Sequence, residues 1–146
     1  MGLAATILMD LWAFLLSRVA GVPMPNWGLV GRWVAHLRDR VFHQDIAAAD
    51  PVPNERLIGW AFHYAVGIAY GVTLALLMGA AWLRDPTFWP AWIFSILMLG
   101  FGWFLLQPGM GAGWAASRTP NPTKARSLGL LAHTVFAVGL WLGAQL

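Results

Sequence analysis

The sequence predicts an all-α fold, a bundle of four transmembrane helices, from three observations. Of the 146 residues, 59% are hydrophobic and only 10% are charged, whereas soluble domains carry about 25% charged residues. Four apolar stretches each approach or exceed the roughly 20 residues that a helix needs to cross a bilayer. The ten tryptophans agree with this interpretation, because Trp concentrates at membrane interfaces. We therefore expect one integral membrane domain over residues 1–146.

The four spans are predicted at residues 2–20, 57–83, 88–106 and 128–146. The first lacks a basic leader and holds Asp10 in its apolar centre, unlike a cleaved signal peptide, so we expect it to be retained. Pro86 ends the second span in a tight turn before the third. In the long first loop, Asn26 is positioned to cap a short amphipathic helix. We expect that helix to lie in the membrane interface.

The charge distribution predicts how the chain crosses the membrane. Eight of the nine positive charges belong to the first and third loops or their borders, and only Arg84 lies in the turn between spans two and three. The positive-inside rule makes those two loops cytoplasmic and places both termini outside. The net charge of +3 thus reports topology and indicates no nucleic-acid partner. The absence of cysteine excludes disulfides, thiolate metal sites and a Cys nucleophile.

Three ionisable residues lie inside the predicted spans: Asp10, His63 and His133. An Asp at a helix centre in a bilayer costs about 2.5–3.5 kcal/mol on insertion scales, so such residues usually face a bundle interior or an aqueous cavity and mark a functional site. At 1.5 Å rise per residue, both histidines lie roughly 8–9 Å inside the cytoplasmic boundary, with Asp10 nearer the midplane. These three residues are the candidate ligand or relay site.

A sparse internal repeat relates the second span to the fourth. Both read Arg-x2-Gly-x3-His-x3-small, the first as Arg56, Gly59, His63 and Gly67 and the second as Arg126, Gly129, His133 and Ala137. The repeat is either a chance match or the trace of a duplicated helical hairpin, whose halves an axis along the membrane normal would relate. In the second span small residues recur every four positions on either side of His63, at Gly59, Gly67, Gly71, Ala75 and Gly79, and in the fourth span Gly139 and Gly143 form another such pair. That stripe predicts close helix packing, with His63 inside a helix interface.

The chemistry of the two histidines stays open at this point. They could hydrogen-bond across an interface as packing residues, or serve as the axial ligands of a haem b. With Asp10 they could form a proton or metal-ion relay. Acid–base chemistry on a lipid or isoprenoid is the weakest option, because no Ser-His-Asp spacing supports it, and we assign no catalytic residue. A last alternative is a non-catalytic subunit that joins a homo-oligomer or a larger membrane complex.

The third loop is rich in glycine and positive charge. Gly109, Gly111 and Gly113 resemble a phosphate-binding loop, but no strand precedes them as a βαβ unit requires. Four basic side chains and one Asn would gather near the histidine layer. They are Arg56, Arg118, Asn121, Lys124 and Arg126. We expect this cytoplasmic mouth either to contact anionic lipid headgroups or to capture an anionic ligand.

Several short motifs are distributed over nearly the whole chain. They are Ala5-Thr6, Met9-Asp10-Leu11-Trp12, Gly31-Arg32-Trp33, Gly59-Trp60, His63-Tyr64, Gln107-Pro108-Gly109, Ser117-Arg118-Thr119-Pro120-Asn121-Pro122, and His133 with Phe136. Through these motifs the chain resembles a family of small bacterial integral membrane proteins that is known only as a domain of unknown function. The resemblance implies a four-helix protein of the bacterial inner membrane, and it carries over no established activity.

Overall fold

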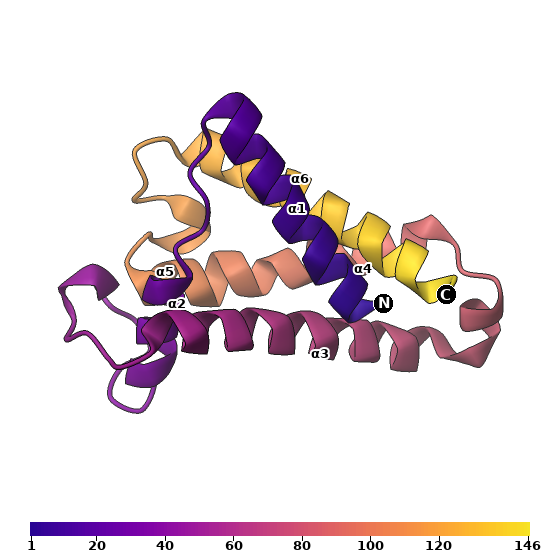
Figure 1. Ribbon diagram of the computed structural model, residues 1–146, viewed down its shortest axis with the longest axis horizontal. Helices are drawn as coiled ribbons and strands as arrows, with labels where there is room; N and C mark the ends of the chain where they lie inside the picture. The colour runs from indigo at the N-terminus through magenta and orange to yellow at the C-terminus, as the bar shows by residue number, and fades with distance from the viewer. The chain divides into compact units, whose positions relative to one another are not determined.

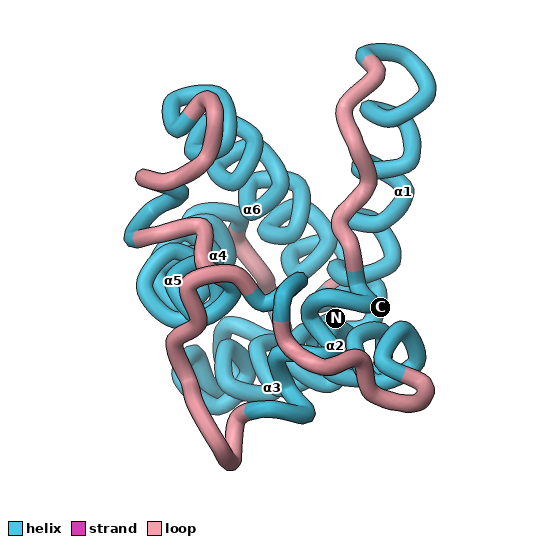
Figure 2. The backbone as a smooth tube through the Cα atoms, turned by 90° about the vertical axis from the view of Figure 1, so that its left-hand side faces the viewer, coloured by secondary structure: helices cyan, strands magenta, loops and turns pink.

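The computed structural model describes all 146 residues and contains helices and loops but no strand (Figures 1 and 2). The α-helices are α1 (Gly2–Ala20), α2 (Trp27–His36), α3 (Glu55–Arg84), α4 (Phe88–Phe101), α5 (Gln107–Met110) and α6 (Pro122–Ala144). Three short elements lie between them: the 3-10 turns η1 (Ile46–Ala48) and η3 (Trp114–Ala116), and the π-helical turn η2 (Gly102–Leu106). The predicted all-α fold is confirmed.

Four helical segments are long and apolar enough to cross a membrane. They are Gly2–Ala20, Glu55–Arg84, Phe88–Met110 and Pro122–Ala144. The third continues beyond the predicted end at residue 106, because η2 and α5 follow α4 without a break. The fourth begins at Pro122 rather than at 128, because Pro is favoured in the first helical turn and the Asn121 side chain accepts a hydrogen bond from the Lys124 amide at 2.9 Å.

The chain forms two compact units, each built from separate segments. The first comprises Met1–Pro25, Tyr64–Met98 and Gly129–Leu146, and the second comprises Asn26–His63 and Leu99–Leu128.

In the first unit, α1 packs against both α3 and α6 through small residues. The pairs that meet are Gly67 with Thr6, Gly71 with Gly2, Gly139 with Ala5, and Gly143 with Met1. A Cβ at any of these glycines would collide with its partner. The predicted role of the small-residue stripes in close helix packing is therefore confirmed at these positions. The core beside these contacts is built from Ala5, Leu74, Trp82, Ala91, Phe94, Phe136 and Leu140.

One glycine of the predicted stripe has a different role. Gly79 has a φ of 71° and a ψ of 177°, which interrupts the helical backbone near the end of α3. Nothing lies within 4 Å of a Cβ built there. Gly79 thus allows a backbone conformation that favours glycine, and it is not a packing position.

In the second unit, α2 crosses the start of α3 at two glycines. A Cβ on Gly31 would collide with the Glu55 carbonyl oxygen, and a Cβ on Gly59 would collide with the Trp27 carbonyl oxygen. The predicted cap of α2 is confirmed, because Asn26 Oδ1 accepts a hydrogen bond from the Leu29 amide at 3.3 Å. The backbones of the two helices therefore meet with no side chain between them.

Candidate intramembrane polar site

Asp10 is hydrogen-bonded to a side chain of another span. The Tyr64 hydroxyl, on α3, donates to Asp10 Oδ2 on α1 at 2.9 Å. A tyrosine hydroxyl can donate one hydrogen bond and accept others, so it is suited to hold a carboxylate within an apolar helix and to exchange a proton with it. Sequence reasoning missed Tyr64. The sequence signal that could have found it is that a carboxylate inside a membrane needs a hydrogen-bond donor from another side chain.

His133 is held by the backbone of its own helix and by α4. Its Nδ1 lies 3.1 Å from the Gly129 carbonyl oxygen, one turn earlier in α6. Because a carbonyl oxygen only accepts, Nδ1 carries the proton of the neutral ring and Nε2 keeps the lone pair. The His133 carbonyl oxygen accepts a bond from Ser95 Oγ at 2.6 Å. The imidazole is thus oriented with a basic nitrogen available for a proton or a ligand.

His63 belongs to the second unit and stacks on an aromatic side chain there. Its ring lies over that of Trp27, with centroids 3.9 Å apart and planes 26° from parallel. Trp60 meets the same ring edge-on at 5.9 Å. His63 is only 8% exposed, which confirms that it points into a helix interface. The stacking partner on α2 was not predicted.

The three predicted intramembrane residues are therefore distributed over two units. Asp10 and His133 share the first unit, where Asp10 accepts from Tyr64 and His133 contacts the Gly129 carbonyl oxygen. Within either unit, no three His, Asp or Glu side chains gather to hold a metal ion. The joint action of Asp10, His63 and His133 stays a prediction.

The predicted cytoplasmic mouth residues all belong to the second unit and are all exposed. They are Arg56, Arg118, Asn121, Lys124 and Arg126. Two of them have structural roles. Asn121 caps α6, as described above, and Arg126 Nε donates to the Ala115 carbonyl oxygen at 2.8 Å.

Ala115 and its neighbour Ala116 have φ values of 46° and 60°, a left-handed conformation that is unfavourable for alanine.

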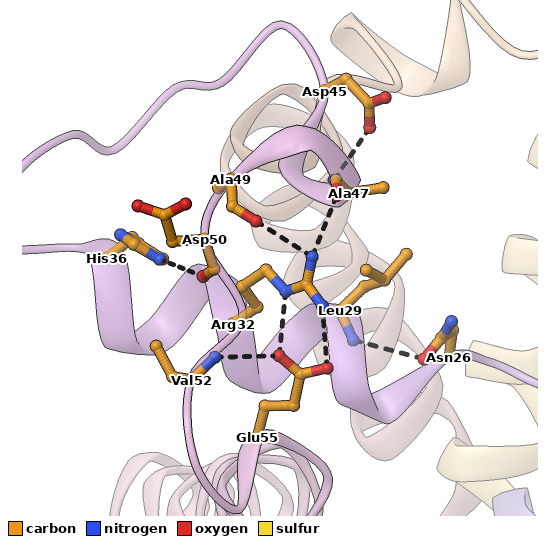
Figure 3. A network of polar contacts seen from close by, with 10 residues as sticks. All are labelled: Asn26, Leu29, Arg32, His36, Asp45, Ala47, Ala49, Asp50, Val52 and Glu55. Atoms are coloured by element: carbon orange, nitrogen blue, oxygen red, sulfur yellow. Dashed lines mark hydrogen bonds and ion pairs between the residues drawn. The ribbon is translucent and has the colours of Figure 1, made fainter.

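The first loop is held by an arginine whose role was not predicted. Arg32 makes a two-point contact with Glu55, with Nε–Oε2 at 2.9 Å and Nη2–Oε1 at 3.0 Å (Figure 3). Its Nη1 donates to the carbonyl oxygens of Ala47 and Ala49 at 2.9 and 3.1 Å. The side-chain hydrogen bond with Glu55 raises the pKa of the Arg32 guanidinium. These bonds fix residues 47–49 and the start of α3 to α2.

The glycines of the third loop have structural explanations. A Cβ on Gly109 would collide with the Trp33 indole, and one on Gly111 would collide with the Gln44 carbonyl oxygen. Gly111 and Gly113 also have φ values of 96° and 74°, which favour glycine. Close approach and left-handed backbone therefore account for this sequence, in agreement with the absence of a phosphate-loop context.

Comparisons with known proteins place the chain in a family. No curated protein and no solved structure matches it. The family model described as "Protein of unknown function (DUF2938)" matches residues 1–146, which is the whole chain. The four helices of membrane length in this chain agree with the resemblance that the sequence motifs indicate. The chain therefore belongs to the DUF2938 family of proteins of unknown function.

Proposed function

We propose that this protein handles a proton within the membrane, at a site centred on the Asp10 carboxylate and the Tyr64 hydroxyl. The observation that carries the proposal is their 2.9 Å hydrogen bond between two helices of membrane length. Intramembrane carboxylates are expensive to maintain and recur in proton pathways. A carboxylate and a hydroxyl can exchange a proton without a large movement of either group.

His133 is the second titratable group that we propose for this function. Histidine changes its charge near neutral pH, and the Nδ1 bond to the Gly129 carbonyl leaves Nε2 as the basic atom. A proton is favoured over a metal ion as the species handled, since the described side chains of a unit offer no set of three metal ligands.

The proposed setting is the bacterial inner membrane with both termini outside. The supporting observation is the concentration of eight of nine positive charges in the first and third loops, which the positive-inside rule makes cytoplasmic. The lipid bilayer is then the first partner of the protein, and a homo-oligomer or a larger complex would use the helix faces that are exposed in the monomer.

Proton flux into liposomes tests the function. Purified protein is reconstituted with a pH-sensitive dye inside the vesicles, and a potassium gradient with valinomycin drives proton entry. We expect flux with the unaltered protein, a decrease of roughly tenfold or more for Asp10→Asn, in the range of lost acid–base groups, and a smaller decrease for Tyr64→Phe.

The matched control is Asp85→Asn, because Asp85 is an exposed carboxylate in the turn after α3. It should leave the flux unchanged. Flux that is no faster than in empty liposomes, or that Asp10→Asn leaves intact, would overturn the proposal. A Soret band in the purified protein that disappears in His63→Ala or His133→Ala would instead establish the haem b alternative. Co-purification of a partner from native membranes would favour the accessory-subunit alternative.

A further inference from the structure

The third membrane-length helix is interrupted by a π-helical turn. Over Gly102–Leu106 the backbone follows π geometry, and the Gln107 amide donates to the Gly102 carbonyl oxygen five residues earlier. Pro108 follows at once and has no N–H, so the Phe104 carbonyl oxygen lacks the donor that an α-helix would give it. π-Helical turns are rare and occur frequently at functional sites.

Two buried polar atoms lie beside this interruption without a hydrogen-bond partner. They are Trp103 Nε1, a donor, and Gln107 Oε1, an acceptor. The two residues stand four apart and bracket about one turn of the π-helical segment, so they lie on the same side of it. Buried polar groups are nearly always satisfied by protein or by a bound molecule. A donor and an acceptor that both lack a partner on the same side of this turn therefore indicate a bound molecule that pairs with both.

The chemistry of the two atoms selects the kind of bound molecule. A metal cation would be repelled by the indole N–H, and an anion would be repelled by the amide oxygen. A hydroxyl group fits both, since it accepts from Trp103 Nε1–H and donates to Gln107 Oε1. Nothing in this pairing involves Asp10, Tyr64 or His133.

We propose that Trp103 and Gln107, at the π-helical turn, form a binding position for one hydroxyl-bearing molecule within the third span. The position is independent of the proposed proton site. The hydroxyl is that of a buried water or of a glycerol-type lipid headgroup. Breaks in membrane helices are tolerated where waters or neighbouring groups satisfy the freed backbone.

A double-mutant cycle on the full-length protein tests the position. Gln107→Leu is introduced into the unaltered protein and into Trp103→Phe, and thermal unfolding is followed in phosphatidylcholine vesicles and in phosphatidylglycerol vesicles. The cycle subtracts the change in stability that Trp103→Phe causes through lost packing alone. If both side chains bind the same molecule, Gln107→Leu should lower the Tm by several degrees more in the unaltered protein than in the Trp103→Phe background.

The lipid composition distinguishes the two sources of the hydroxyl. Phosphatidylglycerol carries headgroup hydroxyls and phosphatidylcholine carries none, so a coupling present in both lipids identifies water, and a coupling seen only with phosphatidylglycerol identifies the headgroup. The control pair is Trp89→Phe with Gln44→Leu, two exposed positions, which should show no coupling. If Gln107→Leu shifts the Tm equally in both backgrounds and in both lipids, the two side chains do not bind the same molecule and the proposal is overturned.

Discussion

The Tyr64 hydroxyl donates a 2.9 Å hydrogen bond to the Asp10 carboxylate and so ties α1 to α3. The same two helices meet through Thr6 with Gly67 and Gly2 with Gly71, where no larger residue fits. The close approach that the glycines permit is what brings a carboxylate on one span within reach of a hydroxyl on another. Helix packing and the polar site are thus two consequences of one small-residue interface.

This bond should contribute measurably to stability. Hydrogen bonds between membrane helices contribute about 0.6 kcal/mol on average and at most about 1.7 kcal/mol. We expect Tyr64→Phe to lower the free energy of unfolding by an amount in that range. A double-mutant cycle with Asp10→Ala, which removes the acceptor, measured by denaturant unfolding in mixed micelles, should recover the same coupling. A coupling of zero would show that the contact does not persist in the folded protein in micelles.

The crossing of α2 over α3 should depend on Gly59. A methyl group at this position would collide with the Trp27 carbonyl oxygen, which is backbone and cannot move aside as a side chain can. Overpacking of this kind typically costs about 1–3 kcal/mol, occasionally more, so Gly59→Ala should lower the Tm. Release of Trp27 from the His63 ring would accompany it, visible as a change in tryptophan fluorescence.

Gly100→Ala is the matched control for that substitution. Gly100 lies within α4, and the nearest atom to a Cβ there is Phe104 Cδ2 at 3.9 Å, which is ordinary contact. Alanine is the better helix former by about 0.8–1.0 kcal/mol, so Gly100→Ala should leave the Tm unchanged or raise it. A decrease for both variants of similar size would mean that packing against Trp27 is not the cause.

The Arg32 contacts should keep the first loop closed to proteases. Lysine preserves the charge but cannot reproduce the two-point contact with Glu55 or the bonds to both carbonyl oxygens. We therefore expect Arg32→Lys to increase cleavage and amide hydrogen exchange over residues 46–55. Arg38→Lys serves as the control, since Arg38 is exposed in the same loop. Equal protection in the two variants would contradict a role of Arg32 in fixing the loop.

The sequence was sufficient to predict features that depend on local pattern. Hydropathy identified the four spans, the glycine stripes identified packing faces, and Asn26 identified the start of α2. The partners Tyr64 and Trp27 could not be predicted in this way, because each contact joins residues far apart in the chain. Which side chains meet then depends on the rotation of both helices.

Two further differences have equally physical causes. The sequence places Arg32 among the positive charges of the first loop, and that pattern cannot distinguish a solvated cation from one paired with Glu55 and two carbonyl oxygens. The third span was predicted to end at residue 106, where the continuous apolar stretch stops. The π-helical turn accommodates the missing N–H of Pro108, so the helix continues to Met110.

Replacing alanine with glycine should stabilise the protein at a left-handed position of the third loop and destabilise it within a helix. Ala115 has a φ of 46° and a ψ of 48°, a conformation that costs an L-residue roughly 1–2 kcal/mol and costs glycine nothing. Ala115→Gly should therefore raise the free energy of unfolding by about 0.5–1 kcal/mol, after subtraction of the entropy that glycine loses on folding. Ala65→Gly, at an exposed position in the interior of α3, should lower it by about the same amount. Denaturant unfolding of the two variants beside the unaltered protein measures both, and a loss of stability at Ala115 would show that its backbone is not left-handed in the folded protein.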